Sequence, residues 1–219
     1  MKMSLLDIVQ DILSDMNSDE VNSINDTVES MQVAQIVKST YFELMSNKNW
    51  PHLRNLTRLE PSNDNLKPTH MRIPQAVKEV EWIQYNKREK NNLSLAKYED
   101  IEYKDIDTFI RLTNQYDTTA DHVTEVTDFS GVVFSVKNNE HPKYWTSFDD
   151  DYVVFNAYNS AIESTLVQNM TRVLVYLEPT WTMQDTYIPD LPDEGFPALL
   201  AESKSTSFAR IKQMPDQKA

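Results

Sequence analysis

Glycine is the residue that most constrains this chain, because only two occur in 219 residues, Gly131 and Gly195. Soluble proteins average about 7% glycine, so the content here is far below the ordinary level. Loops that wrap around phosphate need several glycines close together, since their backbone must approach the ligand closely. Two isolated glycines cannot build such a loop. The sequence therefore points away from a nucleotide-dependent enzyme.

Charge and cysteine content exclude further classes of function. The chain has 34 Asp and Glu against 21 Lys and Arg, which gives a formal net charge of −13. Such a surface repels phosphates, so we do not expect duplex binding by charge neutralisation. Cysteine is absent, which excludes disulfides, thiolate metal sites and a cysteine nucleophile.

The N-terminal segment has no membrane-targeting pattern. Asp7 and Asp11 interrupt the apolar run there, which is too short for a signal peptide or an anchor. We therefore expect no membrane contact and a protein that stays in the compartment where it is made.

Two amphipathic helices are predicted near the N-terminus. Apolar residues recur at helical spacing over residues 4–16, with Ser4 placed as the N-cap. A longer helix is predicted over residues 27–47, capped by Asn25 or Asp26. The apolar stripe of this second helix consists of Val33, Ile36, Val37, Tyr41, Leu44 and Met45.

The middle of the chain has a strand pattern. Short segments rich in β-branched and aromatic residues alternate there with prolines. Helical spacing returns over residues 101–116, and Pro197 suits the first turn of a C-terminal helix that extends to residue 212. The predicted strands lie within residues 53–59, 71–73, 77–85, 123–126, 132–136, 152–155 and 171–177.

These elements predict an α+β fold. Residues 1–50 are expected to form an N-terminal helical pair, and residues 51–190 a β-rich lobe with an inserted helix. Residues 191–219 are expected to form a C-terminal helix, which packs with the N-terminal helices in an antiparallel bundle, and an extended polar tail.

The sequence offers no strong metal site. Three consecutive aspartates at residues 149–151 would hold a divalent cation only if their oxygens converged. Consecutive side chains point in different directions, which favours a turn whose aspartates accept backbone hydrogen bonds. Imidazole ligation is not expected either, because no close pair occurs among His52, His70, His122 and His141.

Acid/base chemistry is the remaining catalytic possibility. Glu99 with Asp100, or Asp105 with Asp107, could hydrolyse sugars, a reaction that uses two carboxylates about 5–10 Å apart. A chain with 34 acidic residues offers many such pairs by chance. No serine lies in a nucleophile-elbow pattern. We therefore expect no catalytic site and no cofactor.

Two clusters have both a structural and a functional interpretation. The basic residues Lys87, Arg88 and Lys90 favour an exposed hairpin tip over a nucleic-acid site. Aromatic residues crowd residues 144–158, which is typical of a core and also of a buried protein interface.

Several segments together carry a resemblance to a known family. They are residues 5–9, 11–13, 41–44, 49–50, 69–74, 142–149, 152–155, 188–192, 196–200 and 202–204. Taken in order, they resemble the head-to-tail adaptor of short-tailed bacteriophages, the family also called tail tubular protein A or head completion protein. None of these segments is a catalytic motif.

The resemblance implies a structural protein of the virion, found in the phage neck and, before assembly, in the host cytoplasm. Members of the family bind the portal protein as a dodecameric ring, extend the DNA channel and form the docking platform for the tail nozzle protein. The helices would form the ring body, with the β-rich lobe facing the tail. The portal-binding residues would be Met214, Pro215, Asp216, Gln217, Lys218 and Ala219.

An acidic channel suits that function, because DNA passes negative walls without specific binding. Two alternatives remain open at this point. One is a virion-associated peptidoglycan hydrolase that uses a carboxylate pair. The other is an adaptor protein unrelated to viruses.

Overall fold

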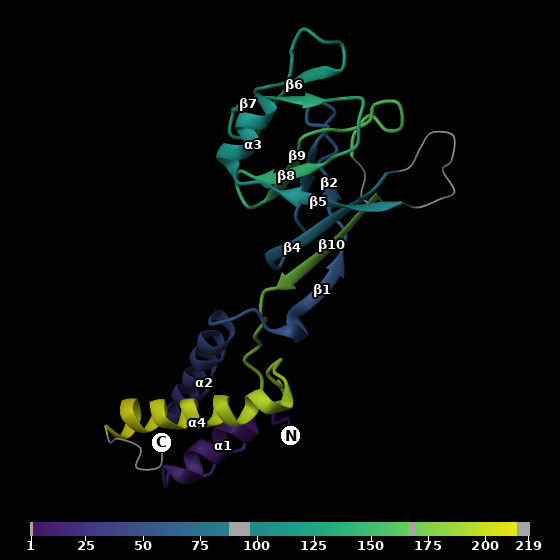
Figure 1. Ribbon diagram of the computed structural model, residues 1–219. Helices are drawn as coiled ribbons and strands as arrows, with labels where there is room; N and C mark the ends of the chain where they lie inside the picture. The colour runs from purple at the N-terminus through teal and green to yellow at the C-terminus, as the bar shows by residue number, and fades with distance from the viewer. Residues whose placement is uncertain (1, 88–96, 167–169, 214–219) are drawn as a thin grey trace. The chain divides into compact units, whose positions relative to one another are not determined.

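The computed structural model describes residues 2–87, 97–166 and 170–213. The chain divides into two compact units. One unit contains Met1–Leu53 and Glu178–Ala219, and we call it the helical unit. The other contains Arg54–Leu177, and we call it the sheet unit. Figure 1 shows the elements of both.

The helical unit is built from three α-helices that pack together (Figure 1). As predicted, Ser4 caps the first helix, and its side chain and that of Asp7 satisfy each other's backbone N–H groups. The second helix begins after Thr27, which is bonded in the same way to Ser30, so the predicted Asn25 or Asp26 cap is wrong. The helices are α1 (Leu5–Asp15), α2 (Val28–Ser46) and α4 (Phe196–Ser207), the last continued by a π-helical turn, η4 (Phe208–Lys212).

Apolar side chains from all three helices form the core of the helical unit. Val33, Val37 and Tyr41 of α2 are fully buried there, as the predicted stripe requires. Burying each large apolar side chain contributes about 1.5–3 kcal/mol to folding. At the edge of this core, Lys204 on α4 pairs with Asp15 on α1 and ties the two helices together.

The sheet unit contains an eight-stranded sheet with the order β1-β10-β4-β5-β8-β9-β3-β2. Its strand pairs are antiparallel except for β5 and β8, which are parallel. A separate hairpin, β6–β7, and the helix α3 (Ile106–Thr113) share a small apolar core with one face of the sheet. The strands are β1 (Arg54–Thr57), β2 (Glu60–Pro61), β3 (His70–Arg72), β4 (Val77–Asn86), β5 (Tyr98–Tyr103), β6 (Val123–Thr127), β7 (Val133–Lys137), β8 (Tyr144–Ser147), β9 (Tyr152–Phe155) and β10 (Thr171–Leu177).

The predicted fold class, an α+β fold whose antiparallel helical bundle forms a ring body, is wrong. The described residues form a mixed α/β structure with a large curled sheet of eight strands and four α-helices. Part of the predicted helix over residues 101–116 belongs to β5, which pairs with β4 and β8. Local periodicity misses this outcome because strand pairing joins segments far apart in the chain.

Candidate functional site

The acidic pair Glu99 and Asp100 stabilises the sheet unit. Glu99 forms ion pairs with Lys87 and Lys97, and these hydrogen bonds lower the pKa of its carboxyl. Asp100 accepts a hydrogen bond of 2.8 Å from the Gln84 side chain on the neighbouring strand. A general acid in sugar hydrolysis needs a raised pKa, so Glu99 has the opposite of the required property.

The second acidic pair belongs to α3. Asp105 is the N-cap of this helix and accepts a hydrogen bond of 3.0 Å from the Thr108 backbone N–H. Hydrogen bonding by the Thr108 side chain, and then by its backbone, lowers the pKa of the Asp105 carboxyl. Asp107 lies 3.0 Å from Arg111 one turn later. Both carboxylates therefore have structural contacts, and neither pair supports the hydrolase alternative.

The three consecutive aspartates form a turn, as predicted. The Asp149 carboxylate accepts hydrogen bonds from the backbone N–H groups of Asp151, at 3.1 Å, and Tyr152, at 2.9 Å. Asp150 has a φ of 62°, in the left-handed region, so the chain reverses there before β9. Among the residues that the structure describes, no three His, Asp or Glu side chains are grouped as metal ligands.

The remaining candidate residues from the sequence, the histidines and the basic cluster, do not come together in one site. His70 is buried against Asp128, whereas His52 contacts the backbone oxygen of Asp190. In the basic cluster, Lys87 pairs with Glu99, and Arg88 and Lys90 lie outside the described residues. The proposed portal-binding residues also lie outside them: Met214, Pro215, Asp216, Gln217, Lys218 and Ala219.

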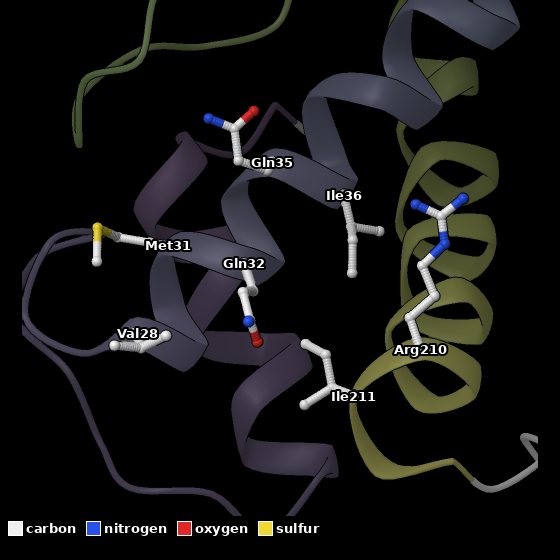
Figure 2. A pocket seen from close by; sticks show the side chains of 7 residues that line it. All are labelled: Val28, Met31, Gln32, Gln35, Ile36, Arg210 and Ile211. Carbon is white, nitrogen blue, oxygen red and sulfur yellow. The ribbon is translucent and has the colours of Figure 1, made fainter.

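A groove lined by both apolar and polar side chains lies between α2 and η4 in the helical unit. It has a volume of about 570 Å³. Ile36 on α2 and Ile211 on η4 extend toward each other across it, and Val28 lies at the start of α2 (Figure 2). Val28 is 67% exposed and Met31 is 42% exposed. The lining residues are Val28, Met31, Gln32, Gln35, Ile36, Arg210 and Ile211.

Both walls of this groove are fixed by contacts within the unit. Lys212 on η4 lies 3.0 Å from Glu29 on α2, and the Ser18 hydroxyl donates a hydrogen bond of 2.8 Å to the same carboxylate. Burial alone would raise the pKa of Glu29, but these bonds outweigh it and lower the pKa. The ion pair therefore joins η4 to α2 beside the groove.

The π-helical turn η4 determines which side chains line the wall of the groove opposite α2. Its wider turn follows α4 directly and ends at Gln213, whose φ of 54° is left-handed. Such turns are rare and occur frequently at functional sites. Here the turn places Arg210 and Ile211 beside α2.

The solvent-facing side of α2 also carries exposed apolar residues, namely Val28, Met31 and Phe42. Val28, Met31, Gln35 and Phe42 follow one another at intervals of three, four and seven residues, so they share one face. Phe42 is 37% exposed and also packs against Trp181, with ring centroids 6.5 Å apart. We call the face formed by Val28, Met31, Gln35, Ser39 and Phe42 the outer face of α2.

Sequence reasoning missed this surface because it assigned only the inner stripe of α2. The available signal was that apolar residues occur on both sides of the helix, whereas a surface helix ordinarily has one polar side. Large contiguous exposed apolar patches mark sites of contact with proteins, membranes or ligands.

Comparison with known proteins adds no family assignment. No protein-family model matches the chain, and no curated protein matches it either. As for membranes, none of the helices in the described ranges is long and apolar enough to cross a bilayer.

Proposed function

We propose that this chain is a structural virion protein, the head-to-tail adaptor of a short-tailed bacteriophage. In this function it binds the portal protein as a dodecameric ring, extends the DNA channel and forms the docking platform for the tail nozzle protein. It acts in the neck of the virion, after synthesis in the host cytoplasm. It needs no cofactor, because the function is assembly.

The observation that carries this proposal is the exposed apolar surface of the helical unit. The groove beside α2 has a volume of about 570 Å³, and the apolar residues at its rim are open to solvent. Surfaces of this type bind other proteins, since partner side chains remove the apolar groups from water. The carboxylates that could have supported hydrolysis have structural contacts instead.

The charge of the chain supports the same function. Twelve copies would multiply a formal net charge of −13. DNA that moves through a ring of acidic subunits meets few cations that could hold its phosphates. The channel would therefore conduct DNA without binding it specifically.

The test is the mass of the complex that the protein forms with the portal ring of the same virion. Native mass spectrometry or light scattering is expected to show about twelve added copies per portal ring. A protein that leaves the mass of the portal ring unchanged would contradict the proposal.

A variant that lacks residues 214–219 tests the proposed portal contact within the same experiment. It is expected to bind the portal at least about tenfold more weakly, a loss of about 1.4 kcal/mol. The melting temperature of the free variant is the control for folding. A second control carries the same six residues in scrambled order and is expected to bind as weakly as the deletion. Unchanged binding by the deletion variant would exclude these residues as the portal contact.

A further inference from the structure

The hairpin β6–β7 is attached to the rest of the sheet unit at both of its ends. At the open end, the Lys137 N–H donates a hydrogen bond of 3.2 Å to the Asn156 backbone oxygen, and the Lys137 oxygen accepts one of 2.9 Å from the Tyr158 N–H. The two strands pair with each other in a ladder of their own. The turn at residues 128–132 lies at the other end of this ladder, and side chains attach it to the sheet.

Asp128 and His70 make the attachment at the turn. The Oδ2 atom of Asp128 accepts hydrogen bonds from the backbone N–H of Ser130, at 2.8 Å, and from its hydroxyl, at 2.5 Å. The Oδ1 atom lies 3.0 Å from Nε2 of His70 on β3. The side chains of His70 and Asp128 are 0% and 2% exposed. One carboxylate thus shapes the turn and also joins it to the sheet.

Aromatic rings enclose the imidazole of this pair. Phe129, which follows Asp128 in the turn, stands edge-on to His70 at 5.7 Å between ring centroids. The same phenyl ring packs on Tyr152 of β9 at 4.4 Å. Phe134 of β7 lies 5.9 Å from the imidazole. The turn therefore keeps His70 out of water while it stays on the sheet.

A second proton on His70 does not suit these surroundings. Its Nδ1 atom is buried and has no hydrogen-bond partner in the described ranges, so an N–H there would be a buried donor without an acceptor, which costs free energy. Burial opposes the charged ring most strongly. Asp128 in the turn and Asp149 before β9 favour the charged ring, Lys67 before β3 opposes it, and together these effects lower the pKa of His70.

We propose that His70 and Asp128 form an acid-sensitive latch, which releases the turn of the hairpin from the sheet when His70 is protonated. In the open form both ring nitrogens contact water, so the cost of the buried N–H disappears. The backbone hydrogen bonds of Lys137 do not titrate, and they act as the hinge. Release uncovers apolar side chains beneath the hairpin, among them Phe109 on α3 and Val154 on β9.

The sign of the pH dependence follows from the two forms. The open form binds the proton more readily, with a pKa near the ordinary value of about 6.5. The closed form is therefore favoured above about pH 6.5, and opening increases as the pH falls below that value. This switch goes beyond the proposed adaptor function, because it controls when an apolar surface of the sheet unit is exposed.

Thiol labelling measures the opening, because the chain has no cysteine of its own. Val154→Cys places a thiol beneath the hairpin, and Val173→Cys is the matched control in the other core of the sheet unit. Both valines are fully buried. The labelling rate of each folded variant, divided by its rate in denaturant at the same pH, gives the open fraction and removes the effect of pH on the thiol.

The open fraction of Val154→Cys is expected to rise at least about threefold between pH 7.5 and pH 5.5, since one proton changes it at most about tenfold per pH unit. At pH 5.5 it is expected to exceed that of Val173→Cys at least about tenfold. Equal open fractions at the two positions would overturn the proposal, because the sheet unit would then open only as a whole. An open fraction of Val154→Cys that does not change with pH would also overturn it.

Exchange of His70 identifies the group that titrates. In the Val154→Cys chain, His70→Gln keeps an N–H donor for Asp128 but takes up no proton, so the open fraction is expected to be the same at both pH values. His122→Gln is the matched control, because His122 is an exposed histidine directly before β6. It is expected to keep the full rise. A rise that survives His70→Gln would exclude His70 as the switch.

Asp128→Asn tests the latch from its other side and does not require His70→Gln to fold. The amide carries no charge and holds the imidazole less strongly, so the open fraction of Val154→Cys at pH 7.5 is expected to be at least about threefold higher. Asp121→Asn removes an exposed carboxylate before β6 and is expected to leave the open fraction unchanged. Equal open fractions in these two variants would contradict the latch. None of these measurements uses the portal, so the latch and the adaptor function can fail independently.

Discussion

At the scale of the residue, His70 is a buried histidine whose two ring nitrogens have different surroundings. Its Nε2 atom lies 3.0 Å from the Asp128 carboxylate, which can only accept a hydrogen bond when ionised. The proton of the neutral ring is therefore assigned to Nε2. The Nδ1 atom is buried and has no hydrogen-bond partner in the described part of the chain.

Burial and charge act in opposite directions on this pair. Burial lowers the pKa of His70, and the charge of Lys67 lowers it further. Together these effects outweigh Asp128 and Asp149, which raise the pKa. Burial would raise the pKa of Asp128, but hydrogen bonds from Ser130 and His70 keep it lowered. The folded protein thus holds a neutral imidazole beside an ionised carboxylate.

The consequence is a dependence of stability on pH. The pKa of His70 is lower in the folded state than the unfolded value of about 6.5. Its contribution is therefore fully present above about pH 6.5 and is lost as the pH falls below that value, because the unfolded chain then binds the proton more readily. We expect the melting temperature to fall between pH 7 and pH 5.

A substitution identifies the group responsible. His70→Gln keeps an N–H donor for Asp128 but cannot titrate, so it is expected to flatten the melting temperature between pH 7 and pH 5. His122→Gln removes an exposed histidine and is the matched control, with the pH dependence of the parent chain. If His70→Gln kept the full dependence, another group would have to cause it.

At the scale of the element, Phe109 is the largest buried side chain by which α3 packs on its core. Phe109 is fully buried and packs edge-on against Phe134, at 5.9 Å between ring centroids, and Phe148, at 6.1 Å. Phe109→Ala is expected to lower the free energy of unfolding by about 3–5 kcal/mol, because it leaves a cavity in this core. Denaturant titration followed by near-ultraviolet circular dichroism measures the loss.

The control for this substitution lies on the same helix. Ile106 is 47% exposed, and Ile106→Ala is expected to change the free energy of unfolding by less than about 0.5 kcal/mol. Equal effects of the two substitutions would mean that α3 does not dock through Phe109.

Local elements of this fold could be predicted from the sequence where a side chain itself defines the boundary. Ser4 and Asp7 mark the start of α1, and Pro197 lies in the first turn of α4. The sequence did not predict β5, because residues 101–103 form a strand through pairing with β4 and β8. The spacing of apolar residues in this segment does not indicate a strand. The sheet order was inaccessible for the same reason.

The groove between α2 and η4 also could not be predicted from the sequence. Ile211 and Ile36 are 175 positions apart, and only the packing of α4 against α2 and the π-helical turn bring them together. The turn at residues 149–151 could be predicted, because its hydrogen bonds lie within four residues.

At the scale of the whole molecule, the sheet unit is expected to fold when expressed alone. Residues 54–177 form one of the two compact units and contain two apolar cores of their own. The unit also begins and ends on paired strands, so its excision leaves both ends of the sheet intact. Circular dichroism and a cooperative thermal transition would confirm folding, whereas a chain without a transition would contradict it.

The pairing of β1 with β10 also determines how the sheet unit responds to mechanical load. Arg54 lies opposite Tyr176, so the two chain connections leave the unit at the same end of an antiparallel pair. Tension applied through them opens the β1–β10 ladder like a zipper, and the hydrogen bonds break one after another. A shearing geometry would load all of them at once and resist a larger force. The sheet unit is therefore mechanically compliant along the path by which it is tethered.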